Sequence, residues 1–511
     1  MAKTWNKDRA VVHIDKKIDE LESVTIKDYG RDKSLENIAV TEAYRVDGVH
    51  MYADILNLEE MLNVTDVEGE RCHQKTLRFL DLHYRAVTRI LDRVDSKRVD
   101  FHNQRLHSVF VKPYNTEANA EKKRLQRAVA TAQLIIDVLK ETGDEEESLP
   151  AAKVRIGIDT GRALAVNNGR RGNREPLFLG NPANHAAKIA GKGISVGIFL
   201  TNTARTALGL ETLDKPEHGA IDYDTIKSCQ DSAALNVTAE TIVKEWREDL
   251  KNKPIGAFKF YGHTPPLCTL DIGALTPGNS RRQDAVSIYA DISGFTSYVE
   301  SHIDHNTDDV VRVLHVIRAE FERVLAVEFE GRRIRFIGDC MHGLLCEGTA
   351  QTTDAESTVT NSTLLSGALR SSFNLALERL KANGYITGDI GLAIGFEYGP
   401  MTVTRLGMHA DRIRCSVSRG VLVSESRQRD CYGHETAIGT GAVKVASDAV
   451  KKLFGNKNKV SHLDYNEAVE QLADNGDSTA KSARNATFSA APAIIRALNQ
   501  PVRPHCVTLS A

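Results

Sequence analysis

The chain has 511 residues, of which 41% are hydrophobic and 26% charged, and this composition excludes a wholly disordered, collagenous or coiled-coil protein. Its 66 basic and 68 acidic side chains give a net charge of −2, which leaves no basic excess for binding a nucleic-acid backbone. No apolar run approaches the roughly 18 residues that a membrane span requires, and the N-terminus lacks the apolar core of a secretory signal. The eight cysteines include no C-x-x-C pair, which indicates reduced thiols. We therefore expect a cytoplasmic protein with no membrane and no nucleic-acid partner.

Three sequence blocks occur twice, in the same order. VHMYADILNL (49–58) is matched by VSIYADISGF (286–295), DFHNQRLHSVF (100–110) by RFIGDCMHGLL (335–345), and VRIGIDTG (154–161) by GLAIGFEYG (391–399). The spacing from the first block to the second also agrees between the two copies. The sequence therefore predicts a tandem duplication of one module.

Between the first two blocks of each copy, apolar residues recur with helical spacing, over 73–94 and over 310–327. The resulting order, β–α–(α)–β–β, predicts an α+β module of the ferredoxin-like type, with helices on one face of an antiparallel sheet.

The domain boundaries follow from the two copies. We expect a charged leader (1–40), a first module (41–267), a linker (268–283), a second module (284–455) and a polar tail (456–511). The leader and the tail carry no motif from which a role can be predicted.

Two carboxylates of the second copy are expected to converge. Asp291 ends a strand, and Asp339 lies at the tip between two strands. Together with the carbonyl of Ile292 they suit Mg²⁺ or Mn²⁺, which prefer oxygen ligands. The turn that follows leads through Phe295 and Thr296 into a helix, whose first backbone N–H groups can meet phosphate oxygens. Taken alone, the pair could equally be a helix cap and a hairpin turn.

The strand and turn YADISGFT (289–296), followed by IRFIGD (334–339), resemble the hallmark of the class III nucleotidyl cyclases. In that family two modules pack head-to-tail, so the resemblance implies an intramolecular pseudo-heterodimer, which a monomer can form. It also implies that Asp291 and Asp339 bind two divalent cations. In the first copy Asp54 persists, but Gln104 stands at the second carboxylate position.

The segment FLGNPANHAAKIAGKG (178–193) is similar to the family's Asn/Arg helix and places Asn184 and Lys188 in its catalytic positions. An amide can position the ribose, and a cation one turn later can stabilise charge at the α-phosphate. Lysine in place of arginine loses the bidentate fork. The second copy has Leu422 or Val423 at the asparagine position, so the resemblance implies one competent and one inactive site.

Three further cations are candidates for binding the triphosphate: Arg405, Arg412 and Lys253.

The family's two base-reading positions fall on Asp100 and Leu177, which match neither purine signature. An ionised carboxylate accepts hydrogen bonds only, so Asp100 suits uracil N3–H, the amino group of cytosine, or the N1–H and amino edge of guanine, but not adenine N1. The chain thus looks like the pyrimidine cyclases of bacterial Pycsar anti-phage defence. This resemblance implies conversion of UTP, or next of CTP, to a cyclic nucleotide that activates a separate effector protein. The alternatives are a guanylate or adenylate cyclase, a catalytically silent nucleotide-binding homologue, and an acid/base hydrolase.

Overall fold

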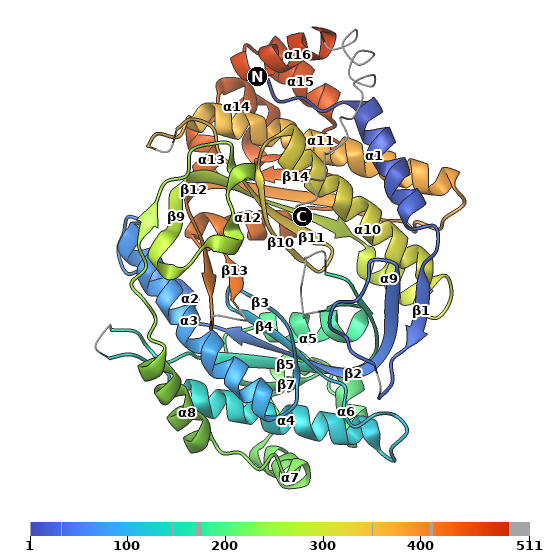
Figure 1. Ribbon diagram of the computed structural model, residues 1–511, viewed down its shortest axis with the longest axis vertical. Helices are drawn as coiled ribbons and strands as arrows, with labels where there is room; N and C mark the ends of the chain where they lie inside the picture. The colour runs from blue at the N-terminus through green and yellow to red at the C-terminus, as the bar shows by residue number, and fades with distance from the viewer. Residues whose placement is uncertain are drawn as a thin grey trace, which may run out of the picture.

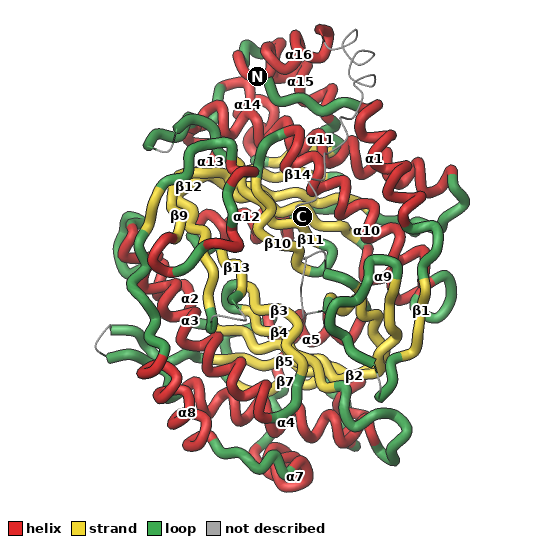
Figure 2. The backbone as a smooth tube through the Cα atoms, in the orientation of Figure 1, coloured by secondary structure: helices red, strands yellow, loops and turns green. Residues whose placement is uncertain are grey.

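The computed structural model describes residues 2–31, 33–145, 148–168, 176–349, 351–408 and 412–489. Its two β-sheets lie one above the other in Figure 1, each with helices on its outer side. Figure 2 shows the strands gathered toward the middle of the molecule and most helices at its two ends. None of the described helices is long and apolar enough to cross a membrane.

The first repeat comprises β2 (Glu42–Ile55), α2 (Leu58–Leu62), α3 (Glu70–Arg93), β3 (Lys97–His102), β4 (Arg105–Phe110), α4 (Ala120–Leu139), β5 (Val154–Val166), β6 (Leu177–Leu179), α5 (Asn181–Gly191), β7 (Gly197–Leu200), α6 (Asn202–Leu208), α7 (Tyr223–Ala233) and α8 (Ala239–Asn252). The second repeat comprises β8 (Phe260–Tyr261), β9 (Ser280–Ser293), α9 (Phe295–His302), α10 (Thr307–Arg323), β10 (Arg332–Ile337), β11 (Cys340–Leu345), α11 (Ala355–Ala382), β12 (Gly391–Leu406), β13 (Ile413–Cys415), α12 (Arg419–Arg429), β14 (Glu435–Ile438), α13 (Thr440–Val445) and α14 (Asp448–Phe454). The N-terminal segment adds α1 (Lys7–Glu20) and β1 (Thr25–Asp28), and the C-terminal segment adds β15 (Lys459–Ser461), α15 (Tyr465–Asp474) and α16 (Ser478–Ser489).

The two sheets share one strand order, as expected for a duplication. The order β3-β4-β2-β5 in the first sheet corresponds to β10-β11-β9-β12 in the second. Equivalent tyrosine–histidine pairs stack at the same register, Tyr52 on His107 with ring centroids 4.1 Å apart and Tyr289 on His342 at 4.4 Å. The histidines at matching positions are therefore core residues in both repeats.

The sheets are mixed, whereas the sequence predicts antiparallel ones. β5 runs parallel to β7, and β12 runs parallel to β14. Each parallel pair is joined through a helix, α5 or α12, because parallel neighbours require a crossover rather than a hairpin. These crossover helices are the elements that carry Asn184 and its counterpart.

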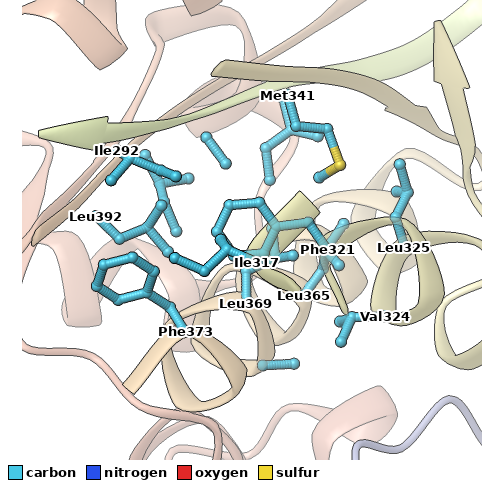
Figure 3. Packing of buried hydrophobic residues seen from close by; sticks show 14 of the residues in the cluster. Ile292, Ile317, Phe321, Val324, Leu325, Met341, Leu365, Leu369, Phe373 and Leu392 are labelled. Atoms are coloured by element: carbon cyan, nitrogen blue, oxygen red, sulfur yellow. The ribbon is translucent and has the colours of Figure 1, made fainter. Parts of the chain in front are cut away.

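The hydrophobic core of the second repeat lies between its sheet and helices α10 and α11. Figure 3 shows Ile317 and Phe321 of α10 beside Leu365, Leu369 and Phe373 of α11. The π-helical turn Val324–Glu328 extends α10 toward β10. This packing fixes α10 directly beneath the strands that carry the two carboxylates.

The predicted leader is a folded part of the molecule. Its α1 buries Ala10, Ile14 and Ile18 in the core of the second repeat, and the Trp5 indole N–H donates to Ser372 Oγ at 2.7 Å. A few residues later, β1 pairs in parallel with β2 of the first repeat. The N-terminal segment therefore contacts both repeats.

The predicted linker and tail also have regular structure. The linker forms short 3₁₀ turns, and β9 already begins at Ser280, while β8 pairs with β9 and so extends the second sheet back to Phe260. In the tail, α15 packs against α11 and buries Tyr465 and Leu472 in the second core.

Candidate active site

A cavity of about 530 Å³ lies between the two repeats and receives side chains from both. The predicted site residues that line it are Asp100, Leu177, Asn184, Lys188, Asp291, Ile292, Phe295, Thr296 and Asp339. Two halves of a proposed site that are more than 100 residues apart in sequence thus face a common space.

The carboxylates of Asp291 and Asp339 line one wall of this cavity. Antiparallel pairing of β9 with β11 sets Ala290 opposite Met341, which brings the end of β9 beside the β10–β11 hairpin tip. Gly338 turns the chain at this tip with φ +61°, in the left-handed region that favours glycine. The strand register and the hairpin turn therefore place the two carboxylates at the same sheet end.

The cavity wall desolvates both carboxylates, although each is partly accessible to solvent. Desolvation raises the pKa of Asp291 to about 6, against hydrogen bonds from Cys340 and Gln428 that lower it. The pKa of Asp339 is raised well above its usual value by desolvation and by the negative charge of Asp291. Two close carboxylates that resist joint ionisation form a donor set that fits a hard divalent cation, since its charge offsets their repulsion.

Ile292 can contribute only its backbone to such a site. Its side chain is 2% exposed and points into the core of the second repeat, as Figure 3 shows. Across the described ranges, no cluster of three or more His, Cys, Asp or Glu side chains suited to a metal ion is present. The possible ligands are thus two carboxylates and a carbonyl, which leave positions open for substrate.

The turn after Asp291 connects the two repeats. Gly294, with φ +81°, begins α9, and Phe295 anchors that helix in the core. Asn184 of α5 donates its Nδ2–H to Thr296 Oγ1 at 2.6 Å. Thr296 therefore orients the amide of the other repeat at the edge of the cavity. Lys188 lies one helical turn beyond Asn184 on the same face of α5, and its side chain is exposed.

Asp100 is held by an arginine that the sequence reasoning missed. Nη1 of Arg335 donates to Asp100 Oδ1 at 3.0 Å and to the carbonyl of Phe101 at 2.6 Å, and the Arg335 side chain is 2% exposed. Arg335 also donates to the carbonyl of Arg414. Its position in the second repeat matches that of Asp100 in the first, and this alignment is the one sequence signal that could have suggested the pair.

The neighbouring cavity wall is aromatic and apolar. It is lined by Tyr52 of β2, Val99 of β3, and Leu177 and Phe178 of β6. These strands belong to the sheet that also carries Asp100. A flat, uncharged ring fits such a wall better than a phosphate does.

The three further cations do not line this cavity. Arg405 donates to the carbonyl of Gly273 at 2.5 Å and to that of Arg412 at 3.4 Å, because β12 runs beside the segment predicted as the linker. Lys253 is an exposed residue at the C-terminal end of α8. The described cationic side chains that do line the cavity are Arg105, Lys188, Arg318 and Arg429. Apart from Lys188, these were missed because their helix and strand positions carry no motif.

The counterpart of the carboxylate pair in the first repeat is built differently. β2 sets Asp54 opposite Arg105, so that Gln104 occupies the position of Asp339 and Arg105 that of Cys340. Arg105 Nη1 lies 3.2 Å from Glu425 Oε1, and Arg105 Nε lies 4.0 Å from Asp54 Oδ2. A protein cation therefore stands beside Asp54, and a neutral amide takes the place of the second carboxylate.

The sequence resemblance implies that replacing Asp54 by Asn leaves activity within about twofold of the wild type, whereas Asp291→Asn loses at least about 10²-fold. Desolvation raises the pKa of Asp54 to about 6, so the neutral amide carries no burial penalty. Initial rates of the two variants at saturating nucleotide measure this difference, and equal melting temperatures show that both variants are folded. An Asp54→Asn enzyme as inactive as Asp291→Asn would show that both halves take part in turnover.

One solved structure shares the whole architecture. The crystal structure of a class III adenylyl cyclase-like ATP-binding protein from Pseudomonas aeruginosa matches with a TM-score of 0.91 at 65% identity, covering 92% of this chain and 100% of that one. No protein-family model matches the chain. The fold is thus that of a class III adenylyl cyclase-like protein.

Two curated relatives show to which family of cyclases the chain belongs. A protein from Pseudomonas aeruginosa named uridylate cyclase is 64% identical over 505 residues, which are 99% of this chain and 98% of the relative. A second uridylate cyclase, from a Rhizobium species, is 39% identical over 429 residues, 81% of each chain. The chain belongs to the nucleotidyl cyclase family that these two uridylate cyclases represent.

Proposed function

We propose that this protein is a uridylate cyclase, which converts UTP to 3′,5′-cyclic UMP and pyrophosphate. One observation carries the proposal: a single cavity combines Asp291 and Asp339 of one repeat with Asn184 and Lys188 of the other. The names of the two relatives support the choice of UTP. The repeats act in this proposal as a head-to-tail pseudo-heterodimer with one competent site.

The reaction is an intramolecular transfer of the α-phosphoryl group. The bond from O3′ to the α-phosphorus forms as the bond from that phosphorus to the bridging β-phosphate oxygen breaks, and the 3′-hydroxyl proton passes to solvent. Asn184, oriented by Thr296, positions the ribose, and Lys188 offsets the charge that develops at the α-phosphate. The backbone N–H groups of the Ser293–Thr296 turn donate hydrogen bonds to phosphate oxygens.

Divalent cations complete this site. Asp291, Asp339 and the Ile292 carbonyl would hold two Mg²⁺ or Mn²⁺ ions, which would supply acidification of the 3′-hydroxyl and neutralisation of the triphosphate charge. The placement of both carboxylates in the wall of the same cavity supports cation binding here.

The base lies, in this proposal, against Tyr52 and Leu177, with its polar edge toward Asp100. A carboxylate accepts the single imide N–H of uracil, whereas cytosine presents an unprotonated N3 that requires a donor. The Arg335 ion pair supports this assignment, because it fixes the orientation of the Asp100 carboxylate.

Asp100→Asn should reduce the preference for UTP over CTP by at least about 10-fold, since an amide can donate to cytosine N3 as well as accept. The variant should also lose on the order of 1–3 kcal/mol of stability, because the buried Arg335 loses its ion pair with Asp100. Competition between UTP and CTP, read by product mass, measures the preference. An unchanged ratio in a less stable variant would assign Asp100 a purely structural role.

The proposed function is tested by incubating the purified chain with Mn²⁺ and UTP, CTP, GTP or ATP, and identifying products by mass. Cyclic UMP as the main product supports the proposal. Cyclic CMP would move the specificity to the other pyrimidine, and cyclic GMP or AMP would make the protein a purine cyclase. ATP is the essential comparison, because the matching crystal structure is described as ATP-binding. No product from any nucleotide would indicate a silent homologue.

We further infer that the product serves as a second messenger for a separate effector protein in the cytoplasm, as part of anti-phage defence. The resemblance of this chain to pyrimidine cyclases supports this role. Cells carrying the gene for this chain should accumulate cyclic UMP after phage infection, and an Asp339→Asn chain should not. Equal cyclic UMP in uninfected and infected cells would contradict the defence role.

A further inference from the structure

Arg318 is a cationic residue of the cavity wall to which the proposed mechanism gives no task. It lies on α10, its side chain is almost fully buried, and it lines the cavity together with Phe336 and Asp339. The guanidinium carbon lies 3.9 Å from the centre of the Phe336 ring. Nη2 donates to the carbonyl of Asn168 in the other repeat at 3.2 Å. Aromatic stacking and a cross-repeat hydrogen bond thus hold its charge in one place.

The duplication shows that this arginine belongs to one half only. Phe101 pairs with Leu106 in the first repeat at the register where Phe336 pairs with Met341 in the second. The side chain that packs on Phe101 from α3 is Tyr84, with ring centroids 5.3 Å apart. Tyr84 donates its hydroxyl proton to the carbonyl of Asn103, at the turn equivalent to Gly338. The first repeat therefore fills the Arg318 position with a neutral side chain.

The arginine and the second carboxylate thus occur in the same repeat. Asp339 has Gln104 as its counterpart, and Arg318 has Tyr84. An arginine needed only for packing on a phenylalanine would serve equally in either half. Desolvation raises the pKa of Asp339, and the charge of Arg318 acts against that rise and so offsets part of that carboxylate's charge. Arg318 also lines the cavity in which an anionic ligand would bind.

A nucleoside triphosphate brings about four negative charges into this cavity. Arg405 and Lys253, considered for this task from the sequence, lie elsewhere. A guanidinium fork matches the geometry of phosphate oxygens, and one fixed by its surroundings loses little entropy on binding.

We propose that Arg318 binds the β- and γ-phosphates of the substrate and, after cyclisation, the pyrophosphate product. This inference rests on the proposed nucleotide cyclase function and adds a residue that holds the leaving group. Arg318 acts as a direct ligand of the phosphates, while Asn184 and Lys188 act at the ribose and the α-phosphate.

Pyrophosphate itself is the probe for a test that needs no turnover. Its affinity for the full chain in the presence of Mn²⁺ is measured by titration calorimetry for the wild type, Arg318→Gln and Arg318→Lys. We expect the Kd to rise about 10- to 100-fold in Arg318→Gln and by a smaller factor in Arg318→Lys, which keeps the charge and loses the fork. Affinity for UMP, which lacks the β- and γ-phosphates, should change less than about twofold in both variants.

Arg333→Gln is the matched control. Arg333 packs on the same Phe336 ring at 4.5 Å but pairs with Glu322 at 3.0 Å and does not line the cavity. Its replacement should leave pyrophosphate affinity unchanged. Equal losses in Arg318→Gln and Arg333→Gln would show that only support of the Phe336 ring matters, and would overturn the proposal.

The remaining outcomes separate this proposal from the proposed function. Wild-type affinity for pyrophosphate in a folded Arg318→Gln chain overturns the role of Arg318 and leaves the cyclase function standing. A wild type that forms no cyclic nucleotide but shows Arg318-dependent pyrophosphate binding overturns the cyclase function alone. If Arg318→Gln does not fold, the Arg318→Lys chain is the test. Unchanged pyrophosphate affinity in Arg318→Lys would overturn the proposal that the guanidinium fork of Arg318 binds the phosphates.

Discussion

Asp339→Asn should abolish cyclisation, with a loss of at least about 10³-fold in kcat, while the chain folds normally. The side chain lies at a hairpin tip in the cavity wall, and an amide of the same shape fits that position. The variant lacks the second carboxylate that the proposed cation site requires. Product formation from UTP with Mn²⁺ measures the loss, and more than a tenth of wild-type activity would remove Asp339 from the cation site.

The same variant should be more stable than the wild type when divalent cations are removed. A carboxyl whose pKa is raised on folding binds more protons in the folded than in the unfolded state, so stability falls as pH rises past its unfolded value. For Asp291 this loss begins above its ordinary value of 3.8 and is complete above about 6, and for Asp339 it extends higher because Asp291 is then charged. The neutral amide removes the repulsion.

Melting curves with EDTA at pH 5 and pH 8 measure this effect. The wild type should lose more stability between the two pH values than Asp339→Asn, by a few degrees in Tm. Added Mn²⁺ should raise the Tm of the wild type at pH 8 and have a much smaller effect on the variant. Equal Mn²⁺ responses in both chains would contradict a cation site at this pair.

Asn184→Leu should lower kcat by about 10²- to 10³-fold, since it removes the amide that positions the ribose in the proposed mechanism. Leucine is the residue that the chain itself carries at the equivalent helix position, Leu422. The change also removes the hydrogen bond from Asn184 to Thr296, so part of the loss arises from the contact between the repeats.

Thr296→Val separates the two contributions. It removes the acceptor of that hydrogen bond and keeps the asparagine, so we expect a loss of about 10-fold. Single-turnover rates for both variants and the double variant measure the coupling. If Thr296→Val were as inactive as Asn184→Leu, the asparagine would act only as a link between the repeats.

The sequence predicts the repeated part of the fold well, because each motif includes its own turn and strand. The helices expected over 73–94 and 310–327 are observed as α3 (Glu70–Arg93) and α10 (Thr307–Arg323). The N-terminal segment could not be placed. Its α1 docks on helices that lie some 300 residues later in the chain, and the local sequence of α1 does not indicate which helices it contacts.

The candidate site likewise has residues that local motifs predict and residues that depend on distant contacts. Asp291, Asp339, Asn184 and Lys188 stand in motifs whose turns and helix faces set their direction, and the cavity receives all four. The Arg335–Asp100 pair depends on how the two repeats meet, which strand register alone does not determine.

The N-terminal segment constrains how the chain can fold during synthesis. The ribosome makes α1 before either repeat, yet the surface that buries Ile14 and Ile18 belongs to α10 and α11 of the second repeat. The first repeat emerges complete while α1 still lacks its docking surface. The apolar face of α1 therefore stays exposed to solvent until the chain is translated past Ala382. A ribosome-bound fragment ending before α11 should therefore bind chaperones through the apolar face of α1, which the complete chain buries.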